Sequence, residues 1–253
     1  MIVCHSKKFI FFKPVKVAGT SIEAMLSDWC GPDDLITGPG LEHYNESLGT
    51  VCDNGNVFKN YVSRNNIDES NGKSRFHNHI SPDLLYKKTK SKWDDYTKIS
   101  VIRNPWDMCV SYLWWSLFKK SWKDLGIDPV ESDTNIDLIR KFRIFLFTEG
   151  TFPDVGYGQS DQIMSSLDWL SWSSNKFYTD DMDYLIRYEN LEEDARVAFS
   201  SVGVEFDTLP RFKTNIRKLN THYSNYYDPF TINLIEFRFD EMIKKFGYKF
   251  KNK

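Results

Sequence analysis

The sequence predicts a three-layer α/β domain, in which helices cover both faces of a largely parallel β-sheet. Two observations support this fold class. Apolar, strand-like runs recur at 9–15, 98–103 and 184–187, and a segment with apolar residues at helical spacing follows each of them. Strands that alternate with helices in this way build parallel sheets, because each crossover returns the chain to the same edge. The absence of repeats and of a Pro/Ser-rich linker favours one domain over 1–253.

The first strand and the first helix are separated by a tight loop. We interpret the N-terminal MIVCHSKKFIFFK as a first strand, in which the run 9–15 (FIFFKPV) is apolar and aromatic. Residues 22–30 (IEAMLSDWC) then carry apolar side chains at helical spacing. The chain therefore begins with a strand, a loop containing Gly19, and a helix.

The middle of the chain repeats this order. A helix is expected over 81–90, since it opens with Ser-Pro, residues suited to the N-cap and the first helical position. The run 98–103 (KISVIR) is a second buried strand. Asn104 can cap the next helix and Pro105 can open it, and the apolar pattern continues to about residue 120.

The remaining elements are predicted from periodicity in the same way. Helices are expected at 136–147, 192–202 and 229–246, with a third strand at 184–187. The polar segment 31–75, with only short strand candidates such as 57–62, and the segment 120–160 are expected to be loops or insertions on the acceptor side of a site.

Composition narrows the class of protein. The chain has 33 basic and 35 acidic residues and 41% apolar residues, a balance typical of a soluble globular protein and not of a nucleic-acid-binding one. No run of 18 apolar residues and no signal-peptide cleavage site is present, so we expect a cytoplasmic protein without a transmembrane segment. Its four cysteines (Cys4, Cys30, Cys52 and Cys109) form no CxxC pair, which favours free thiols.

A candidate phosphate cradle lies between the first strand and the first helix. Lys16-Val17-Ala18-Gly19-Thr20-Ser21 combines a cation, a glycine and two hydroxyls at a helix N-terminus, whose unpaired N–H groups suit an anion. The segment is not a Walker A loop, because the lysine precedes the glycine and GxxxxGK[ST] is absent. A Gly/Ser turn that caps a purely structural helix is the alternative.

A second candidate anion site follows the second strand. Arg103 stands at the carboxyl end of this strand, where ligands collect in open α/β sheets. Ser111 lies eight residues further on, about two helical turns, so both side chains can face the same side. An arginine fork with a hydroxyl suits a phosphate dianion, although Arg103 could equally form a helix-capping salt bridge.

Together these segments resemble a known family. KPVKVAGTSIE and WDDYTKISVIRNPWDMCVSYLWW, followed by LIRYENLEED and by residues 209–250, resemble the sulfotransferases that use 3′-phosphoadenosine 5′-phosphosulfate (PAPS), in particular the carbohydrate branch of heparan sulfate 2-O-like or Golgi-type enzymes. The resemblance implies a P-loop-like central sheet with PAPS as the donor. It also implies that Lys16 contacts the phosphosulfate near its bridging oxygen and that the 17–21 backbone holds the 5′-phosphate.

The same resemblance implies roles for further residues. Arg103 and Ser111 would hold the 3′-phosphate, and no metal is required if Lys16 and the loop neutralise the leaving phosphate. The family's sugar 2-O-sulfotransferases carry a His-x-His segment before this strand, which maps onto His77-Asn78-His79. His79 would then be the general base, with His77 as its helper.

Two basic residues extend the candidate donor site. Lys213 and Arg217 follow Pro210 and could close over the 3′-phosphate, although a solvated basic face is the alternative. The two histidines could also hold a metal, but no third ligand has convincing spacing.

The sequence thus predicts a nucleotide-binding transferase that moves a sulfuryl group from PAPS to a hydroxyl, with a saccharide or glycolipid as the acceptor. A cytoplasmic enzyme of bacterial or viral type is expected. The alternatives are a nucleotide-dependent phosphotransferase on a related scaffold, and a non-catalytic module that binds a nucleotide or an anionic glycan.

Overall fold

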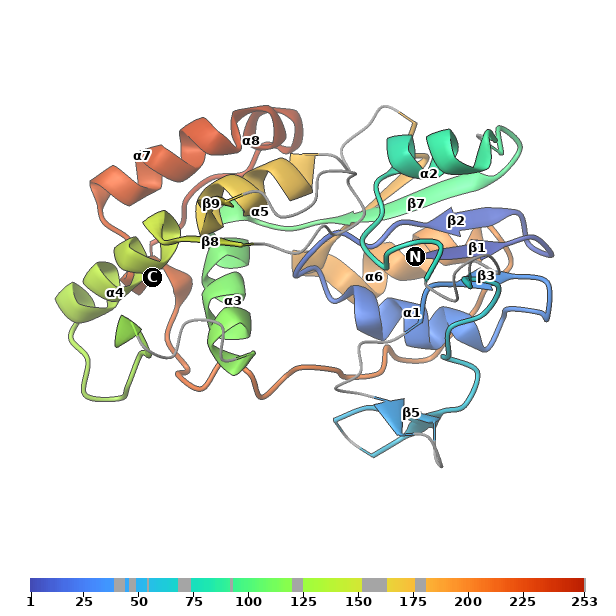
Figure 1. The fold of residues 1–253 in the computed structure, drawn as a ribbon, viewed down its shortest axis with the longest axis horizontal. Coiled ribbons are helices and arrows are strands. Elements are labelled where there is room, and N and C mark those ends of the chain that lie inside the picture. Colours follow the sequence, from blue (N-terminus) through green and yellow to red (C-terminus); the bar gives the residue numbers. More distant parts are fainter. Residues whose placement is uncertain are drawn as a thin grey trace. The chain divides into compact units, whose positions relative to one another are not determined.

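The computed structural model describes residues 1–38, 44–45, 49–53, 55–67, 74–91, 93–119, 125–151, 163–175 and 181–252. The chain divides into two compact units, which we describe separately (Figure 1). The first contains Met1–Ile102 and Lys176–Lys213, and the second contains Arg103–Pro153, Ser160–Asn175 and Thr214–Lys253. The expectation of a single domain stays a prediction.

The first unit is built on a five-stranded sheet. Its strand order is β10-β7-β2-β1-β3, with β10 at Tyr184–Arg187, β7 at Thr97–Ile102, β2 at Phe9–Phe11, β1 at Ile2–Cys4 and β3 at Leu35–Ile36. The β10, β7 and β2 strands run parallel, whereas β1 pairs antiparallel with both β2 and β3. The sheet is therefore mixed, with a parallel centre as predicted and an antiparallel edge that the sequence pattern did not indicate.

The interpretation of the N-terminus as a single strand is wrong. Residues 2–4 and 9–11 are two strands of a hairpin, with Ile2 opposite Phe11 and Cys4 opposite Phe9. The polar stretch 5–8 between them forms the turn, and Lys8 adopts a positive φ of 51° there. A left-handed residue of this kind reverses the chain. In the sequence, a lysine-rich break in an apolar run does not by itself show whether the strand continues or turns back.

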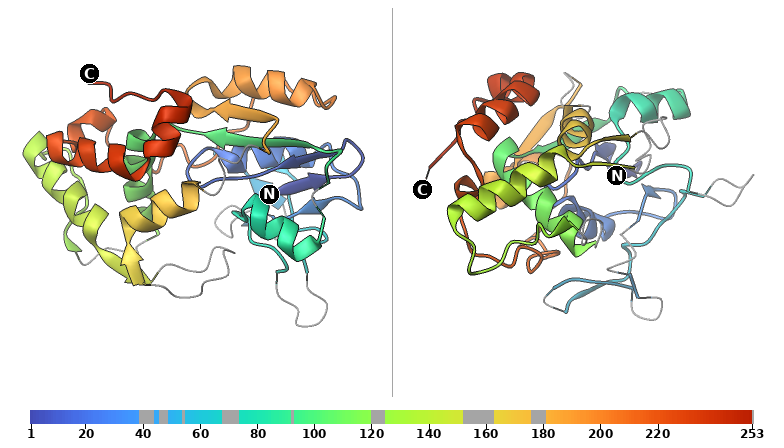
Figure 2. Two further views of the ribbon diagram at one scale, coloured as in Figure 1. Left: turned by 90° about the horizontal axis from the view of Figure 1, so that it is seen from above. Right: turned by 60° about the vertical axis from the view of Figure 1, so that its left-hand side comes forward.

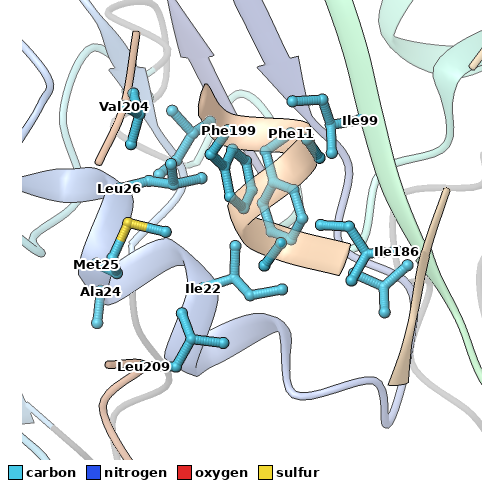
Figure 3. Close-up of a cluster of buried hydrophobic side chains, with 14 of the residues drawn as sticks. Phe11, Ile22, Ala24, Met25, Leu26, Ile99, Ile186, Phe199, Val204 and Leu209 are labelled. Atoms are coloured by element: carbon cyan, nitrogen blue, oxygen red, sulfur yellow. The ribbon is translucent and has the colours of Figure 1, made fainter. Parts of the chain in front are cut away.

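Each face of this sheet is covered by helices. On one face Phe9, Phe11, Ile99 and Ile186 pack against α1 (Gly19–Ser27) and α6 (Leu191–Ser200), as Figure 3 shows for several of these side chains. On the opposite face the alternate residues Ile10 and Phe12 pack against α2 (Pro82–Thr89) and the segment that precedes it. The period-2 alternation of buried side chains directs successive residues to the two layers. The predicted three-layer α/β arrangement is confirmed in this unit.

The long polar segment also belongs to the first unit. Its described part forms a small antiparallel sheet of β4 (Tyr44–Asn45), β5 (Gly49–Val51) and β6 (Val57–Phe58). The expected strand at 57–62 is shorter than predicted. Parts of the predicted 31–75 and 120–160 segments lie outside the described residues.

The second unit is mainly helical. It contains α3 (Pro105–Phe118), α4 (Asn135–Phe147), α5 (Ser166–Asn175), α7 (Pro229–Arg238) and α8 (Asp240–Phe246), with a short 3₁₀ turn, η4 (Tyr223–Tyr226), and a hairpin of β8 (Glu149–Thr151) and β9 (Ile163–Ser165). The α4 helix packs against α5 and η4 (Figure 2). Asn104 caps α3, as predicted, by accepting bonds from the N–H groups of residues 106 and 107.

The C-terminal helix differs from the prediction. The expected continuous helix over 229–246 is interrupted at Phe239, whose backbone leaves the helical region at φ −115° and ψ 26°. The Phe239 side chain is fully buried. Burial of this ring accompanies the break between α7 and α8, a tertiary effect that the helical periodicity of the sequence could not indicate.

The packing of α6 gives a test of the first unit's core. Phe199 is fully buried and meets Phe9 and Phe11 edge-on, with ring centroids 6.5 and 6.1 Å apart. We predict that Phe199→Ala lowers the free energy of unfolding by about 3–5 kcal/mol, since the lost ring leaves a cavity. Denaturant unfolding would measure this change. The control is Val197→Ala on the exposed side of the same helix, which should change stability by less than about 0.5 kcal/mol; equal losses in both variants would contradict the packing argument.

Candidate active site

The predicted phosphate cradle forms the link between β2 and α1. Lys16 and Ala18 both adopt left-handed backbone conformations, with φ of 61° and 59°, which cost non-glycine residues about 1–2 kcal/mol each. The α1 helix then begins at Gly19, and within the described chain no side chain caps its first turn. A helix N-terminus without a side-chain cap, preceded by a strained loop, has the features of an anion-binding turn.

Gly19 is required by a neighbouring side chain. A Cβ atom at position 19 would lie 2.3 Å from Cγ of Lys13, far inside van der Waals contact. The Lys13 side chain occupies the space that a side chain at 19 would need. The packing of Lys13 across the start of α1 thus fixes the residue type at 19.

Lys13 ends in a buried ion pair that the sequence analysis missed. Its ammonium donates a 2.7 Å hydrogen bond to Glu23 on α1, and both side chains are at most 5% exposed. The Tyr61 hydroxyl and the Met1 amino group also donate to this carboxylate. Burial alone would raise the pKa of Glu23, but Lys13 and the Met1 amino group outweigh this effect and hold the pKa below its usual range.

The backbone of Lys13 holds the predicted base. Nδ1 of His79 lies 2.8 Å from the Lys13 carbonyl oxygen, and since a carbonyl only accepts, Nδ1 carries the proton of the neutral ring. The neutral tautomer fixed in this way has its lone pair on Nε2. This is the form of imidazole that can take a proton from a substrate hydroxyl.

His77 supports the same segment through its ring. The His79 backbone N–H donates a 3.0 Å hydrogen bond to Nδ1 of His77, and the two ring centroids are 5.6 Å apart. Nδ1 of His77 is therefore an acceptor, and its contact orders the backbone from which His79 projects. This geometry matches a positioning role for His77.

The surroundings of His79 disfavour its charged form. Burial lowers the pKa of His79 well below its usual 6.5, and the positive charge of Lys13 and the neighbouring His77 lower it further. His79 is consequently neutral at pH 7. A neutral imidazole needs no prior loss of a proton before it acts as a base.

The predicted 3′-phosphate residues gather around a carboxylate in the second unit. Arg103 follows β7 directly and donates from Nε and Nη2 to Asp107 at 3.0 and 2.6 Å. Its Nη1 lies 3.3 Å from the Ser111 hydroxyl, so the predicted proximity of Arg103 and Ser111 on one side of α3 is found. Arg217 donates from Nη1 to the other oxygen of Asp107 at 3.2 Å. Asp107 thus joins two of the predicted cations in one cluster.

Asp107 is the residue that holds this cluster together. Burial would raise its pKa, but Arg103 and Arg217 outweigh this effect and keep the pKa below its usual range. Two guanidinium groups share this carboxylate, and Nε of Arg217 is buried without a hydrogen-bond partner among the described residues. The cluster is therefore suited to an additional anion.

Lys213 adopts a positive φ of 65° and ends the first unit, whereas Arg217 belongs to the second. The prediction that Lys213 and Arg217 close over the 3′-phosphate stays a prediction.

A cavity of about 630 Å³ lies elsewhere in the second unit. It is of the size that holds small ligands. The Trp114 ring forms part of an apolar wall, and Asp128, Glu131 and Lys218 supply charges. The full lining is Trp114, Leu117, Phe118, Asp128, Pro129, Val130, Glu131, Asn215, Ile216, Lys218 and Leu219.

Comparison with known proteins gives one structural likeness. No family model and no curated protein sequence matches the chain. A crystal structure described as a sulfotransferase from Alicyclobacillus acidocaldarius matches with a TM-score of 0.40 and 15% sequence identity, over 94% of this chain and 93% of the other. No helix in the described ranges has both the length and the apolar character needed to traverse a bilayer.

The environment of His79 gives a test by titration. We predict that its imidazole titrates below the ordinary value of 6.5, because burial and nearby cations oppose protonation. The unfolded chain then binds the proton more readily, so stability falls as the pH is lowered from 6.5 toward the folded-state pKa. Proton NMR of the histidine ring signals, with His79→Asn to assign the resonance, would measure the midpoint. A midpoint at or above 6.5 would contradict the described environment.

Proposed function

We propose that this protein transfers a sulfuryl group from PAPS to a hydroxyl, with a saccharide or glycolipid as the acceptor. The observation that carries the proposal is the 2.8 Å contact between Nδ1 of His79 and the Lys13 carbonyl. It ties a neutral, base-competent imidazole to the start of the loop that contains Lys16. A group transfer from an anionic donor to a hydroxyl needs these two functions, an anion site and a base, close together.

The topology of the first unit supports a donor site at one edge of its sheet. The β2 and β7 strands are parallel neighbours, so their carboxyl ends lie at the same edge of the sheet. The loop with Lys16 follows β2, and Arg103 follows β7. Ligands of open α/β sheets bind at this edge. We assign the 5′-phosphosulfate to the first segment and the 3′-phosphate to the second.

In the proposed reaction each residue has a separate task. Nε2 of His79 takes the acceptor's proton while the acceptor oxygen attacks sulfur in line. The bond from sulfur to the bridging oxygen breaks, and adenosine 3′,5′-bisphosphate leaves. Lys16 and the N–H groups of the 17–21 backbone neutralise the charge that develops on the leaving phosphate, a stabilisation that acts mainly in the transition state. His77 keeps His79 in position. This chemistry assigns no role to a metal.

The arginine cluster is the proposed 3′-phosphate site. Arg103 and Arg217 carry the charge, Ser111 adds a hydroxyl, and Asp107 keeps the two guanidinium groups in place in the absence of ligand.

Two alternatives require different chemistry. A nucleotide-dependent phosphotransferase needs a carboxylate for Mg²⁺, whereas Asp107 is engaged by two arginines. A non-catalytic binding module does not require a base, whereas the His79 imidazole is held in the tautomer that can accept a proton at Nε2. The cytoplasmic location stays a prediction.

The donor site can be tested by calorimetric titration with adenosine 3′,5′-bisphosphate, ADP and ATP. We predict clear preference for the bisphosphate, and a loss of about 10- to 100-fold in affinity for Arg103→Ala, because one charge-assisted contact to phosphate disappears. Arg103→Lys keeps the positive charge but loses the bidentate guanidinium group, so its affinity for the bisphosphate should lie between those of the wild type and Arg103→Ala. Arg140→Ala, which removes a surface arginine that is 69% exposed, is the control. Better binding of ATP with Mg²⁺ would favour the phosphotransferase instead.

The base can be tested separately from donor binding. We predict that His79→Asn lowers kcat by about 10²- to 10⁴-fold, the usual contribution of a general base, while the affinity for adenosine 3′,5′-bisphosphate is unchanged. The measurement uses donor with radiolabelled sulfate against a panel of saccharides and glycolipids. His5→Asn, at an exposed histidine, is the control. Normal turnover by His79→Asn at saturating donor would remove the histidine from the mechanism.

A further inference from the structure

Two cysteines and an aspartate that are distant in sequence meet in the first unit. Cys4 ends β1, Cys30 lies just after α1, and Asp34 precedes β3. Each residue offers one atom that can coordinate a metal ion, namely Sγ of each cysteine and a carboxylate oxygen of Asp34. These three atoms all lie within 4.8 Å of one another. Both cysteines are free thiols. The three residues come from three separate parts of the chain, so no local motif in the sequence indicates them.

The carboxylate of this cluster is held in a fixed orientation. Asp34 is 2% exposed. Its Oδ1 accepts a 2.6 Å hydrogen bond from the His5 N–H, and its Oδ2 accepts from the Gly31 N–H at 2.7 Å and from the Cys4 thiol at 3.3 Å. Two backbone donors, one to each oxygen, thus orient the carboxylate with Oδ2 toward Cys4. Hydrogen bonds of this kind commonly orient carboxylates that bind metal ions.

The loop that carries two of the three residues is fixed from outside. Arg64 donates to the carbonyl oxygens of Cys30 and Gly31 at 3.3 and 2.6 Å. Asn65 donates to the carbonyls of Pro32 and Asp34, both at 2.9 Å. The 30–34 loop therefore has little freedom left to lose when a ligand binds.

We propose that Cys4, Cys30 and Asp34 bind a zinc-class divalent cation. Two thiolates and one carboxylate are a ligand set that Zn²⁺ accepts, and tetrahedral coordination at normal bond lengths places neighbouring ligand atoms about 3.6–3.8 Å apart. The observed 3.3 Å between Sγ of Cys4 and Oδ2 of Asp34 is close to this spacing. Binding replaces the thiol protons, which pass to solvent as the thiolates coordinate. A water, or the Ser6 hydroxyl 3.4 Å from Sγ of Cys4, completes the coordination.

The position of this site points to a structural role. Cys4 pairs with Phe9 at the start of β2, whereas the loop with Lys16 follows the other end of the same strand. The cation would join the end of β1, the end of α1 and the start of β3 at the edge opposite the proposed donor loop. The proposal is therefore independent of the proposed sulfuryl transfer.

Cadmium is a suitable probe, because it binds thiolates like zinc and its thiolate bonds absorb in the ultraviolet. Titration of Cd²⁺ into the reduced, chelator-treated full chain should produce this absorption and saturate near about one equivalent per chain. Zn²⁺ should displace Cd²⁺ and also raise the Tm of the wild type. Cys4→Ser and Cys30→Ser should abolish the signal, and Asp34→Asn should weaken binding by about 10- to 100-fold. Cys109→Ser, a matched loss of a thiol in the second unit, should bind as the wild type does.

Several results would overturn the proposal. The proposal is wrong if reduced wild-type protein binds no Cd²⁺ and its Tm does not rise with Zn²⁺, a readout that does not depend on the folding of any variant. A signal of equal size in the Cys4→Ser variant, with circular dichroism showing that it is folded, would place the metal elsewhere. A Cys4–Cys30 disulfide in the non-reduced protein, together with no metal binding after reduction, would identify the pair as a redox site instead.

Discussion

The buried ion pair between Lys13 and Glu23 is the interaction on which the first unit's candidate site depends. The Lys13 side chain crosses the start of α1 to reach Glu23, and its backbone carbonyl holds His79 in one tautomer. One residue therefore sets the position of the helix that follows the anion loop and of the proposed base. A buried pair of this kind adds little net stability compared with apolar residues of the same shape, but the loss of Glu23 leaves the buried Lys13 ammonium without its carboxylate. Its role here is to fix the position of Lys13 and, through the Lys13 carbonyl, that of His79.

The second unit uses the same device at its own candidate site. Asp107 holds Arg103 and Arg217 as Glu23 holds Lys13, through a carboxylate that remains ionised despite burial. In the first unit Lys13 and the Met1 amino group share the Glu23 carboxylate, and in the second Arg103 and Arg217 share the Asp107 carboxylate. The Lys13 contact fixes the backbone that holds His79, whereas the two guanidinium groups are the proposed contacts to a ligand.

The sequence was sufficient to predict features that depend on local order, and insufficient for those that depend on tertiary contacts. The α/β class, the Asn104 cap and the proximity of Arg103 to Ser111 follow from spacing within one element or between consecutive ones. The Arg103–Asp107 pair also had a local signal, since the residues are four apart across the start of α3. By contrast, Lys13 and Glu23 lie on different elements, and the Cys4, Cys30 and Asp34 cluster draws on three. The hairpin at residues 5–8 and the break at Phe239 likewise depend on a turn conformation and on burial of a ring.

The contact between Gly19 and Lys13 has a consequence for how this sequence can change over evolutionary time. Any side chain at 19 collides with Lys13, so position 19 is free to vary only after residue 13 has become smaller. A smaller residue 13, however, removes one of the two buried cations that pair with Glu23, and a neutral residue at 23 leaves the Lys13 ammonium without its carboxylate. Substitutions at the three positions are therefore expected to be epistatic: each single substitution is destabilising, and only their combined replacement is neutral. Drift at the entrance to α1 is therefore expected to be slow, whatever ligand the neighbouring loop binds.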